Sequence, residues 1–240
     1  MRIDILTLFP EMFDGPFGHS IIKRAIERNI VQIGLYNIRD CGIGRHNVVD
    51  DYPYGGGEGM VMMPEPLFES LKKLNIENST PTVLLTPQGR QFSQQIADEL
   101  AQKTRLVLIC GRYEGVDERI REHMATDEIS IGDYVISGGE LAAMVVVDAI
   151  IRRLPGALGA EIQHDSMMNG LLEYPQYTRP DQYQEWEVPS VLLSGNHAEI
   201  AKWRRQQSIE KTAKRRPDLL KDAVLSESER QIIENEIKDR

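Results

Sequence analysis

The stretch Arg105-Leu-Val-Leu-Ile-Cys-Gly-Arg-Tyr-Glu-Gly115 joins an apolar run to a short segment of glycine, charge and an aromatic ring. A short apolar run bounded by glycine is typical of a buried strand, and glycine at its end lets the backbone approach a ligand closely. Similar runs predict further strands at Arg2–Leu8, Val31–Ile38 and Thr82–Thr86, and stretches of helical texture lie between them at Ser20–Arg28, Pro66–Leu74 and Ser93–Gln102. This alternation predicts an α/β fold with a parallel sheet.

A further helix is predicted over the nearly all-apolar segment Leu141–Ile151, which follows Ser137-Gly-Gly-Glu140. A serine followed three residues later by glutamate has the spacing of a capping box. Val145, Val146 and Val147 leave a strand open as the alternative, but the length of the segment and the capping spacing favour a buried helix.

The texture of the chain changes after Ile151. The segment Leu154–Tyr177 contains Pro155, Pro175 and interspersed glycines without a clear period, so it is predicted to be a long loop, of the kind that is usually functional or disordered. Beyond it, helices are predicted at Asn196–Leu220 and Ser226–Asp239, the second with a capping box from Ser226 to Glu229. The C-terminal part is therefore expected to be helical.

Composition sets the class of protein. The chain has 240 residues, 41% hydrophobic and 27% charged, with a mean hydropathy of −0.37, which favours a water-soluble globular protein over a disordered or membrane-spanning one. Cys41 and Cys110 form no close pair, so neither a disulfide framework nor a zinc site is indicated. The first residues lack the features of a signal peptide. We expect a cytoplasmic protein without a membrane anchor.

The net charge of −9 argues against nonspecific adhesion to nucleic acid, but the charge is unevenly distributed. Between Ala201 and Pro217 there are seven lysines and arginines and one glutamate, a balance of +6. This basic segment could bind a polyanion, or it could be the solvated face of a helix. The sequence leaves both interpretations open.

Three groups of residues point to a ligand site. Thr86–Gly89, Cys110–Gly115 and Ser130–Glu140 each follow an apparent strand and contain glycine. Ligands of open α/β sheets gather at the carboxyl ends of strands, although each group could also be a tight turn chosen for geometry. The phosphate-binding loop and the dinucleotide-binding glycine fingerprint are both absent. A ligand held by some other glycine-rich arrangement is therefore expected.

Charged residues crowd the segment after Cys110. Glu114 or Asp117 could accept a hydrogen bond from a ligand amine or hydroxyl, and Arg112 could hold a phosphate or carboxylate. The alternative is that these side chains form ion pairs among themselves.

Four long motifs together resemble a known family, the bacterial tRNA (guanine-N1)-methyltransferases that modify position 37. The motifs are Pro53–Met60, Leu85–Arg90, Cys110–Arg119 and Ser130–Leu141, and the resemblance continues through Arg179-Pro180, Leu193–Glu199, Trp203-Arg204 and Arg215–Leu220. The similarity spans essentially the whole chain. Because the long motifs occur in one order, the resemblance is far more specific than any single glycine pattern.

The resemblance implies a SPOUT-type fold, a parallel α/β sheet with a deep C-terminal trefoil knot, and a homodimer whose active sites lie at the subunit interface. It implies a catalytic domain at residues 1–153, a linking lid at 154–177 and a helical tRNA-binding domain at 178–240 for the anticodon arm. The methyl donor, S-adenosyl-L-methionine, would be held largely by backbone groups. The implied donor-site residues are Leu85, Pro87, Gly111, Tyr113, Glu114, Ser130, Ile131, Gly132, Asp133, Tyr134, Val135, Ile136, Gly138 and Gly139.

By the same resemblance, Asp165 is the base that removes the N1 proton of guanosine 37, and Arg152 stabilises the charge that develops on the base. An isolated aspartate titrates near about 3.9, so its surroundings have to strengthen it as a base. The resemblance allows Mg²⁺ to assist, but no ligand cluster in the sequence demands it. Two alternatives stay open: methylation of another RNA base, and a nonenzymatic RNA-binding protein with structural glycine loops.

Overall fold

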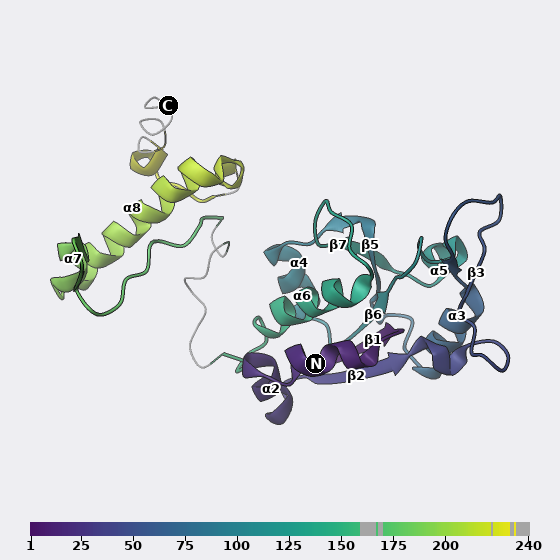
Figure 1. Ribbon diagram of the computed structural model, residues 1–240. Coiled ribbons are helices and arrows are strands. Elements are labelled where there is room, and N and C mark those ends of the chain that lie inside the picture. Colours follow the sequence, from purple (N-terminus) through teal and green to yellow (C-terminus); the bar gives the residue numbers. More distant parts are fainter. Residues whose placement is uncertain (159–166, 168–169, 222, 231–232, 234–240) are drawn as a thin grey trace. The chain divides into compact units, whose positions relative to one another are not determined.

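The computed structural model describes residues 1–158, 167, 170–221, 223–230 and 233. The chain divides into two compact units, Met1–Ala160 and Glu161–Arg240, and each is described by itself (Figure 1). The predicted boundaries at 153 and 177, and the roles assigned to the three parts, stay predictions. Asp165 lies outside the described residues.

A five-stranded parallel sheet forms the centre of the first unit, in the order β2-β1-β6-β5-β7. The strands are β1 (Arg2–Thr7), β2 (Gln32–Asn37), β5 (Thr82–Gln91), β6 (Arg105–Cys110) and β7 (Asp127–Ser130). The prediction of a parallel α/β sheet is confirmed, and β7 is the strand expected before the third glycine group.

Helices cover both faces of this sheet because its strands alternate between two apolar clusters. In β6, Leu106 and Leu108 belong to one cluster, and Val107 and Ile109 belong to the other. The first cluster is covered by α2 (Ser20–Glu27), α4 (Gln94–Ala101) and α6 (Gly139–Ile151), and the second by α3 (Pro64–Lys73) and α5 (Glu118–His123) (Figure 1). A sheet buried on both faces needs the near-continuous apolar strands that the sequence shows.

Short elements complete the first unit. They are η1 (Pro10–Phe13), α1 (Asp14–Phe17), η2 (Ile38–Cys41) and the small antiparallel pair β3 (Asp50–Asp51) and β4 (Val61–Met62). Between β3 and β4 lies a glycine-rich loop in which Gly55, Gly56, Gly57 and Gly59 all have positive φ. The loop therefore relies on glycine for its backbone conformation.

The second unit is built on α8 (His197–Arg215), which begins at the N-cap Asn196, whose side chain accepts a hydrogen bond from the Glu199 N–H. The other elements are β8 (Gln182–Tyr183), β9 (Trp186–Glu187), α7 (Ser190–Leu193) and η3 (Pro217–Lys221). The predicted helix Asn196–Leu220 is too long, because Pro217 lacks the N–H that would continue the helix and a separate short turn begins there. The basic segment lies almost entirely on α8.

One predicted capping box is wrong and the other is confirmed. The N-cap of α6 is Gly138, without a side-chain cap, and Glu140 is buried in contacts with distant residues instead. At the C-terminal box, the Ser226 N–H donates to Glu229 at 2.7 Å and the Glu229 N–H donates to Ser226 Oγ at 3.4 Å. Residues 227–230 are helical, and most of the rest of the predicted helix lies outside the described residues.

Candidate functional site at the carboxyl ends of three strands

A cavity of about 450 Å³ opens at the carboxyl ends of β5, β6 and β7. The glycine-rich segments that follow these strands form its walls, together with the start of α6. Every predicted donor-site residue lines it except Asp133: Leu85, Pro87, Gly111, Tyr113, Glu114, Ser130, Ile131, Gly132, Tyr134, Val135, Ile136, Gly138 and Gly139. Residues spread over some fifty positions of sequence therefore meet around one space. Asp133 is exposed beside it.

The first wall is an outward loop within β5. Ile129 of β7 is paired with Leu85 and again with Arg90, so residues 86–89 project from the sheet ladder. At Gly89 a Cβ atom would lie 2.4 Å from the backbone of Glu128, which makes glycine necessary there. The sequence predicted a loop from Thr86 to Gly89, and these residues indeed do not pair with β7. Their backbone is nevertheless extended, so the strand β5 continues to Gln91.

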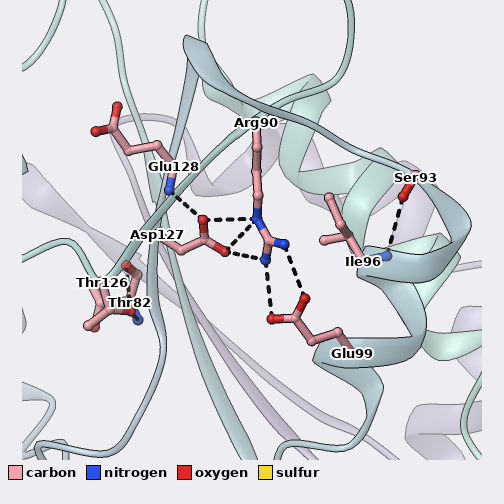
Figure 2. A network of polar contacts seen from close by, with 8 residues as sticks. All are labelled: Thr82, Arg90, Ser93, Ile96, Glu99, Thr126, Asp127 and Glu128. Atoms are coloured by element: carbon pink, nitrogen blue, oxygen red, sulfur yellow. Dashed lines mark hydrogen bonds and ion pairs between the residues drawn. The ribbon is translucent and has the colours of Figure 1, made fainter.

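An ion-pair network anchors this loop (Figure 2). Arg90, directly after it, donates to Asp127 of β7 at 2.7 Å and to Glu99 of α4 at 3.1 Å. The two carboxylates raise the pKa of Arg90 and keep it charged. The guanidinium thus ties the loop to a neighbouring strand and to a helix.

The second wall follows β6 and is held in a strained conformation. Tyr113 has a φ of +59°, a region that costs a bulky residue on the order of 1 kcal/mol. Backbone hydrogen bonds hold it there: the Glu114 N–H donates to Met60 O at 2.9 Å, and the Met62 N–H donates to Gly115 O at 2.9 Å. The segment Met60–Met62, which follows the glycine-rich loop, therefore supports this cavity wall.

The third wall ends where α6 begins against β6. The Gly139 N–H donates to Gly111 O at 2.8 Å. A Cβ atom on Gly139 would lie 2.7 Å from Cys110 Cα, closer than any side chain tolerates. Two backbone segments thus meet at contact distance, and only glycine allows that approach.

Glu140 links these walls to the first strand. Its carboxylate accepts a hydrogen bond from Thr7 Oγ1 at 2.8 Å and forms an ion pair with Arg112 at 3.4 Å, while only 1% of the residue is exposed. The Arg112 guanidinium also lies 4.7 Å from the ring centroid of Phe9. A buried carboxylate needs such partners, and this requirement overrides the local capping geometry predicted for Glu140.

The charged groups after Cys110 largely follow the ion-pair interpretation. Asp117 caps α5 and pairs with Arg119 at 2.9 Å, which lowers the pKa of the Asp117 carboxyl. Arg112 pairs with Glu140 rather than within its own segment. Burial and the neighbouring Glu140 raise the pKa of the Cys110 thiol well above its ordinary range, so this sulfur stays protonated and is a poor nucleophile.

Several lining residues were not predicted, among them Val61, Val116 and Arg121. Val61 and Val116 come to the cavity because Met62 and Val116 form a bridge between segments far apart in the chain. Arg121 lies on α5 and pairs with Glu118 and Glu128. Only the position of α5 directly after the second glycine group could have suggested Arg121.

Of the two predicted catalytic residues, the structure describes Arg152, and this residue does not line the cavity. Arg152 is the C-cap of α6, at the end of that helix remote from Gly139. Asp165 and the adjoining residues 159–166 lie outside the described residues. The structure therefore brings the predicted donor-site residues other than Asp133 together around one cavity, and Arg152 lies at the far end of α6.

Within the described part of the chain, no three histidine, cysteine or acidic side chains are grouped so that they could hold a metal ion. Over the same residues, no helix is both long enough and apolar enough to span a membrane.

These features define an α/β protein with a small-molecule cavity at the carboxyl ends of a parallel sheet. A family model described as tRNA (Guanine-1)-methyltransferase TrmD matches residues 1–222. The chain therefore belongs to this family, as the resemblance of its motifs indicated.

Individual relatives are similar in sequence to this chain over nearly their whole length, and each is named tRNA (guanine-N(1)-)-methyltransferase. The protein from Dehalococcoides mccartyi (strain CBDB1) is 56% identical over 238 residues, 98% of this chain and 96% of its own. That from Desulforamulus reducens is 57% identical over 97% of this chain and 94% of its own. A protein from Staphylococcus epidermidis is 54% identical over 98% of this chain and 96% of its own length.

Proposed function

We propose that this chain is a tRNA (guanine(37)-N1)-methyltransferase, which transfers a methyl group from S-adenosyl-L-methionine to N1 of guanosine 37. The observation that carries the proposal is the cavity, because three motifs shared with the family surround it in a chain that belongs to that family. A tRNA substrate also implies a cytoplasmic enzyme.

The cavity has properties that suit the methyl donor. Its volume of about 450 Å³ lies within the usual range for small-ligand sites, about 300–1,000 Å³. Leu84, Leu85, Ile129 and Ala142 contribute apolar walls, and the closely approaching glycine backbones offer N–H and C=O groups without intervening side chains. S-adenosyl-L-methionine supplies an activated methyl group on a positively charged sulfur, and the exposed Glu114 provides a nearby carboxylate that can accept from its amino group.

Transfer to guanine N1 requires removal of a proton, because N1 is a poor nucleophile while protonated. We assign this step to Asp165, on the similarity of Asp165-Ser166 to the family motif. Arg152 would stabilise the negative charge that develops on guanine O6 as the proton leaves. The proton would pass to the Asp165 carboxylate, and the N1 lone pair would form the bond to the methyl carbon. The carbon–sulfur bond of the donor would break with its electron pair going to sulfur, so that S-adenosylhomocysteine leaves as a neutral thioether.

The position of Arg152 supports a homodimer with shared active sites. Gly139 begins α6 and Arg152 caps its other end, so at about 1.5 Å per residue roughly 20 Å of helix separates Arg152 from the cavity edge. An arginine side chain cannot span that distance. In our proposal Arg152 of one subunit therefore serves the cavity of the other.

The remaining parts of the proposal follow from family membership. They are a SPOUT fold with a trefoil knot in a catalytic domain at 1–153, a lid at 154–177 that carries Asp165, and a tRNA-binding domain at 178–240. The basic segment of α8 would contact phosphates of the anticodon arm. Part of its charge is already used within the unit, since Arg205 pairs with Glu229 and Arg216 with Asp218.

The decisive experiment measures methyl transfer to a tRNA transcript by the wild-type chain and by Asp165→Asn. We expect the substitution to reduce the rate at least a hundredfold while calorimetry shows unchanged binding of the donor, because the base acts on the proton and does not hold the donor. Asp14→Asn, which alters an exposed aspartate of α1, is the matched control and should keep the wild-type rate.

Further readouts separate the alternatives. Mapping the methylated nucleoside distinguishes N1 of guanosine 37 from another RNA base. A chain without saturable donor binding would be a nonenzymatic RNA-binding protein and would overturn the proposal. Comparing rates in magnesium and in EDTA tests whether Mg²⁺ takes part. Near-normal turnover of Asp165→Asn would remove Asp165 from the mechanism.

A further inference from the structure

The second unit contains a cavity of its own, with a volume of about 320 Å³. It lies between the segment 174–181 and the helices α7 and α8. Its lining includes the polar and aromatic residues Tyr174, Tyr177, Arg179, Asp181 and Arg204 and the apolar residues Leu192 and Ile200. Two segments that the sequence comparison singled out, Arg179-Pro180 and Trp203-Arg204, thus meet at one place.

Arg204 has an unusual environment within this unit. Its guanidinium lies 4.7 Å from the ring centroid of Tyr174, and its buried Nε has no hydrogen-bond partner among the described residues. The neighbouring Arg205, by contrast, pairs with Glu229 at 2.7 Å. A buried donor without an acceptor is unfavourable unless a ligand supplies one.

The other charged residues of the cavity do not neutralise Arg204. Arg179 is exposed and, over the described residues, takes part in no ion pair within 4 Å. Asp181 is the acidic residue named in the lining, and its carboxylate accepts from the Gln182 N–H at 3.1 Å. The cavity therefore combines two arginines that lack a carboxylate partner in the described part of the second unit, which favours an anionic ligand.

Aromatic rings give the cavity a second property. Tyr177 is 48% exposed, and its ring centroid lies 6.4 Å from that of Trp203 on α8. An accessible ring beside arginines is the combination that binds single-stranded nucleic acid, with bases stacked on rings and phosphates held by guanidinium groups. A protein carboxylate would use the arginines but would leave the ring unoccupied.

We propose that this cavity binds a single nucleotide of the RNA substrate, with its phosphate on Arg204 and Arg179 and its base stacked on Tyr177. The choice of RNA as the source of the nucleotide rests on the proposed function. The volume, at the small end of ligand cavities, suits one nucleotide rather than a longer segment. Arg204 also belongs to the basic segment of α8, so the rest of a polyanion would meet further positive charge beside the cavity.

The test measures the affinity of the full chain for a tRNA transcript at several KCl concentrations. We expect Arg204→Ala to weaken binding at least tenfold and to reduce the slope of log affinity against log salt by about one, because one phosphate contact is lost. Tyr177→Leu should weaken binding severalfold with the slope unchanged, since stacking carries no charge. Arg230→Ala removes the same charge from an exposed position outside the cavity and should behave as wild type.

Tryptophan fluorescence tests whether the cavity itself is occupied when the tRNA transcript binds. The chain has two tryptophans, so Trp186→Phe leaves Trp203 as the single tryptophan. Because Trp203 lies beside Tyr177, a base stacked on Tyr177 should change the emission of Trp203 when the tRNA transcript binds. Weaker binding by Arg204→Ala without any response from Trp203 would reduce the arginine to a surface contact and overturn the proposal. Equal affinity and slope for Arg204→Ala and Arg230→Ala would overturn it as well.

Two further measurements keep the result interpretable. If Arg204→Ala does not fold, as judged by thermal melting, Arg179→Ala decides the question, because Arg179 is exposed and lines the same cavity. Methyl transfer by the wild-type chain is measured in parallel. A chain that binds the transcript through this cavity but transfers no methyl group would contradict the proposed function and leave the nucleotide site supported.

Discussion

Two cavities among the described residues, one in each unit, differ in what lines them. The cavity at the carboxyl ends of β5, β6 and β7 is lined by glycine-rich segments whose backbones approach each other closely, and its arginines are paired with carboxylates. The cavity of the second unit is formed by side chains, two tyrosines and two arginines that lack a carboxylate partner among the described residues. The first suits a small ligand recognised by shape and backbone hydrogen bonds, and the second suits a polyanion recognised by charge and stacking.

The largest effect is expected where backbone meets backbone. Gly139→Ala places a Cβ atom 2.7 Å from Cys110 Cα, so α6 has to move away from β6. We expect a loss of about 2–3 kcal/mol in the free energy of unfolding and at least a tenfold loss of affinity for S-adenosyl-L-methionine. Urea unfolding and calorimetry measure the two quantities.

The control for this prediction is Gly15→Ala, because a Cβ atom at Gly15 would have no neighbour within 4 Å. Its free energy of unfolding should stay within about 0.5 kcal/mol of wild type. Wild-type donor affinity in Gly139→Ala would show that close backbone contact is not what shapes the first cavity, and the contrast between the two cavities would fail.

A smaller effect is expected from the side chain that supports those walls. Glu140→Gln removes the ion pair with Arg112 while keeping an acceptor for Thr7, and we expect a loss of about 2 kcal/mol in unfolding free energy because the site is buried. A double-mutant cycle with Arg112→Met measures the coupling. Glu27→Gln, in an exposed pair with Lys23, should change stability by less than about 0.5 kcal/mol. Equal losses for the two glutamates would contradict the role given to Glu140.

The smallest effect is expected for the ion pair between Glu229 and Arg205, the neighbour of Arg204 in the chain. Arg205 and the capping contacts of Ser226 lower the pKa of Glu229 from its ordinary 4.5 to about 2. A carboxyl with a lowered pKa in the folded protein stabilises it above pH 4.5, and this contribution is lost as the pH falls toward about 2. Because Arg205 is 38% exposed, screening reduces the contribution to about 1 kcal/mol.

Tryptophan emission can follow this transition, because Trp186 and Trp203 both lie in the second unit. Urea midpoints at pH 6, 4 and 3 should converge for wild type and Glu229→Gln as the pH falls. Glu227→Gln, at an exposed position of the same turn, should keep the wild-type dependence on pH. A constant difference between wild type and Glu229→Gln at all three pH values would refute the assignment.

Local sequence patterns predicted well those features that depend on neighbouring residues. The capping box from Ser226 to Glu229 formed because both partners lie within one turn, and the Glu229 carboxylate bonds to Ser226 while it also pairs with Arg205. The box predicted at Ser137 failed because Glu140 instead contacts Thr7, 133 residues away in the chain. Spacing along the sequence contains no information about such a partner.

At the first cavity, too, local sequence patterns predicted some residues, and distant contacts decided others. Glycines at the ends of apolar strands were sufficient to predict that the three glycine-rich segments gather at one site, because the carboxyl ends of neighbouring parallel strands share one edge of a sheet. Val116 and Arg121 were missed, since their places depend on the bridge to Met62 and on the position of α5. The sequence also did not predict how far Arg152 lies from the cavity. That distance follows from the length of α6, and it becomes known only when the structure places Gly139, the first residue of α6, at the cavity.

The sequence alone determined the α/β class, the parallel sheet and the family, because apolar runs, glycine positions and ordered motifs are properties of short segments. Tertiary structure alone decided which arginines are neutralised and which are not. Arg204 and Arg205 are adjacent in the chain, yet one pairs with Glu229 and the other lies in a cavity on a tyrosine ring. Neighbouring positions on a helix point about 100° apart, so their partners are set by what the fold brings to each side of α8.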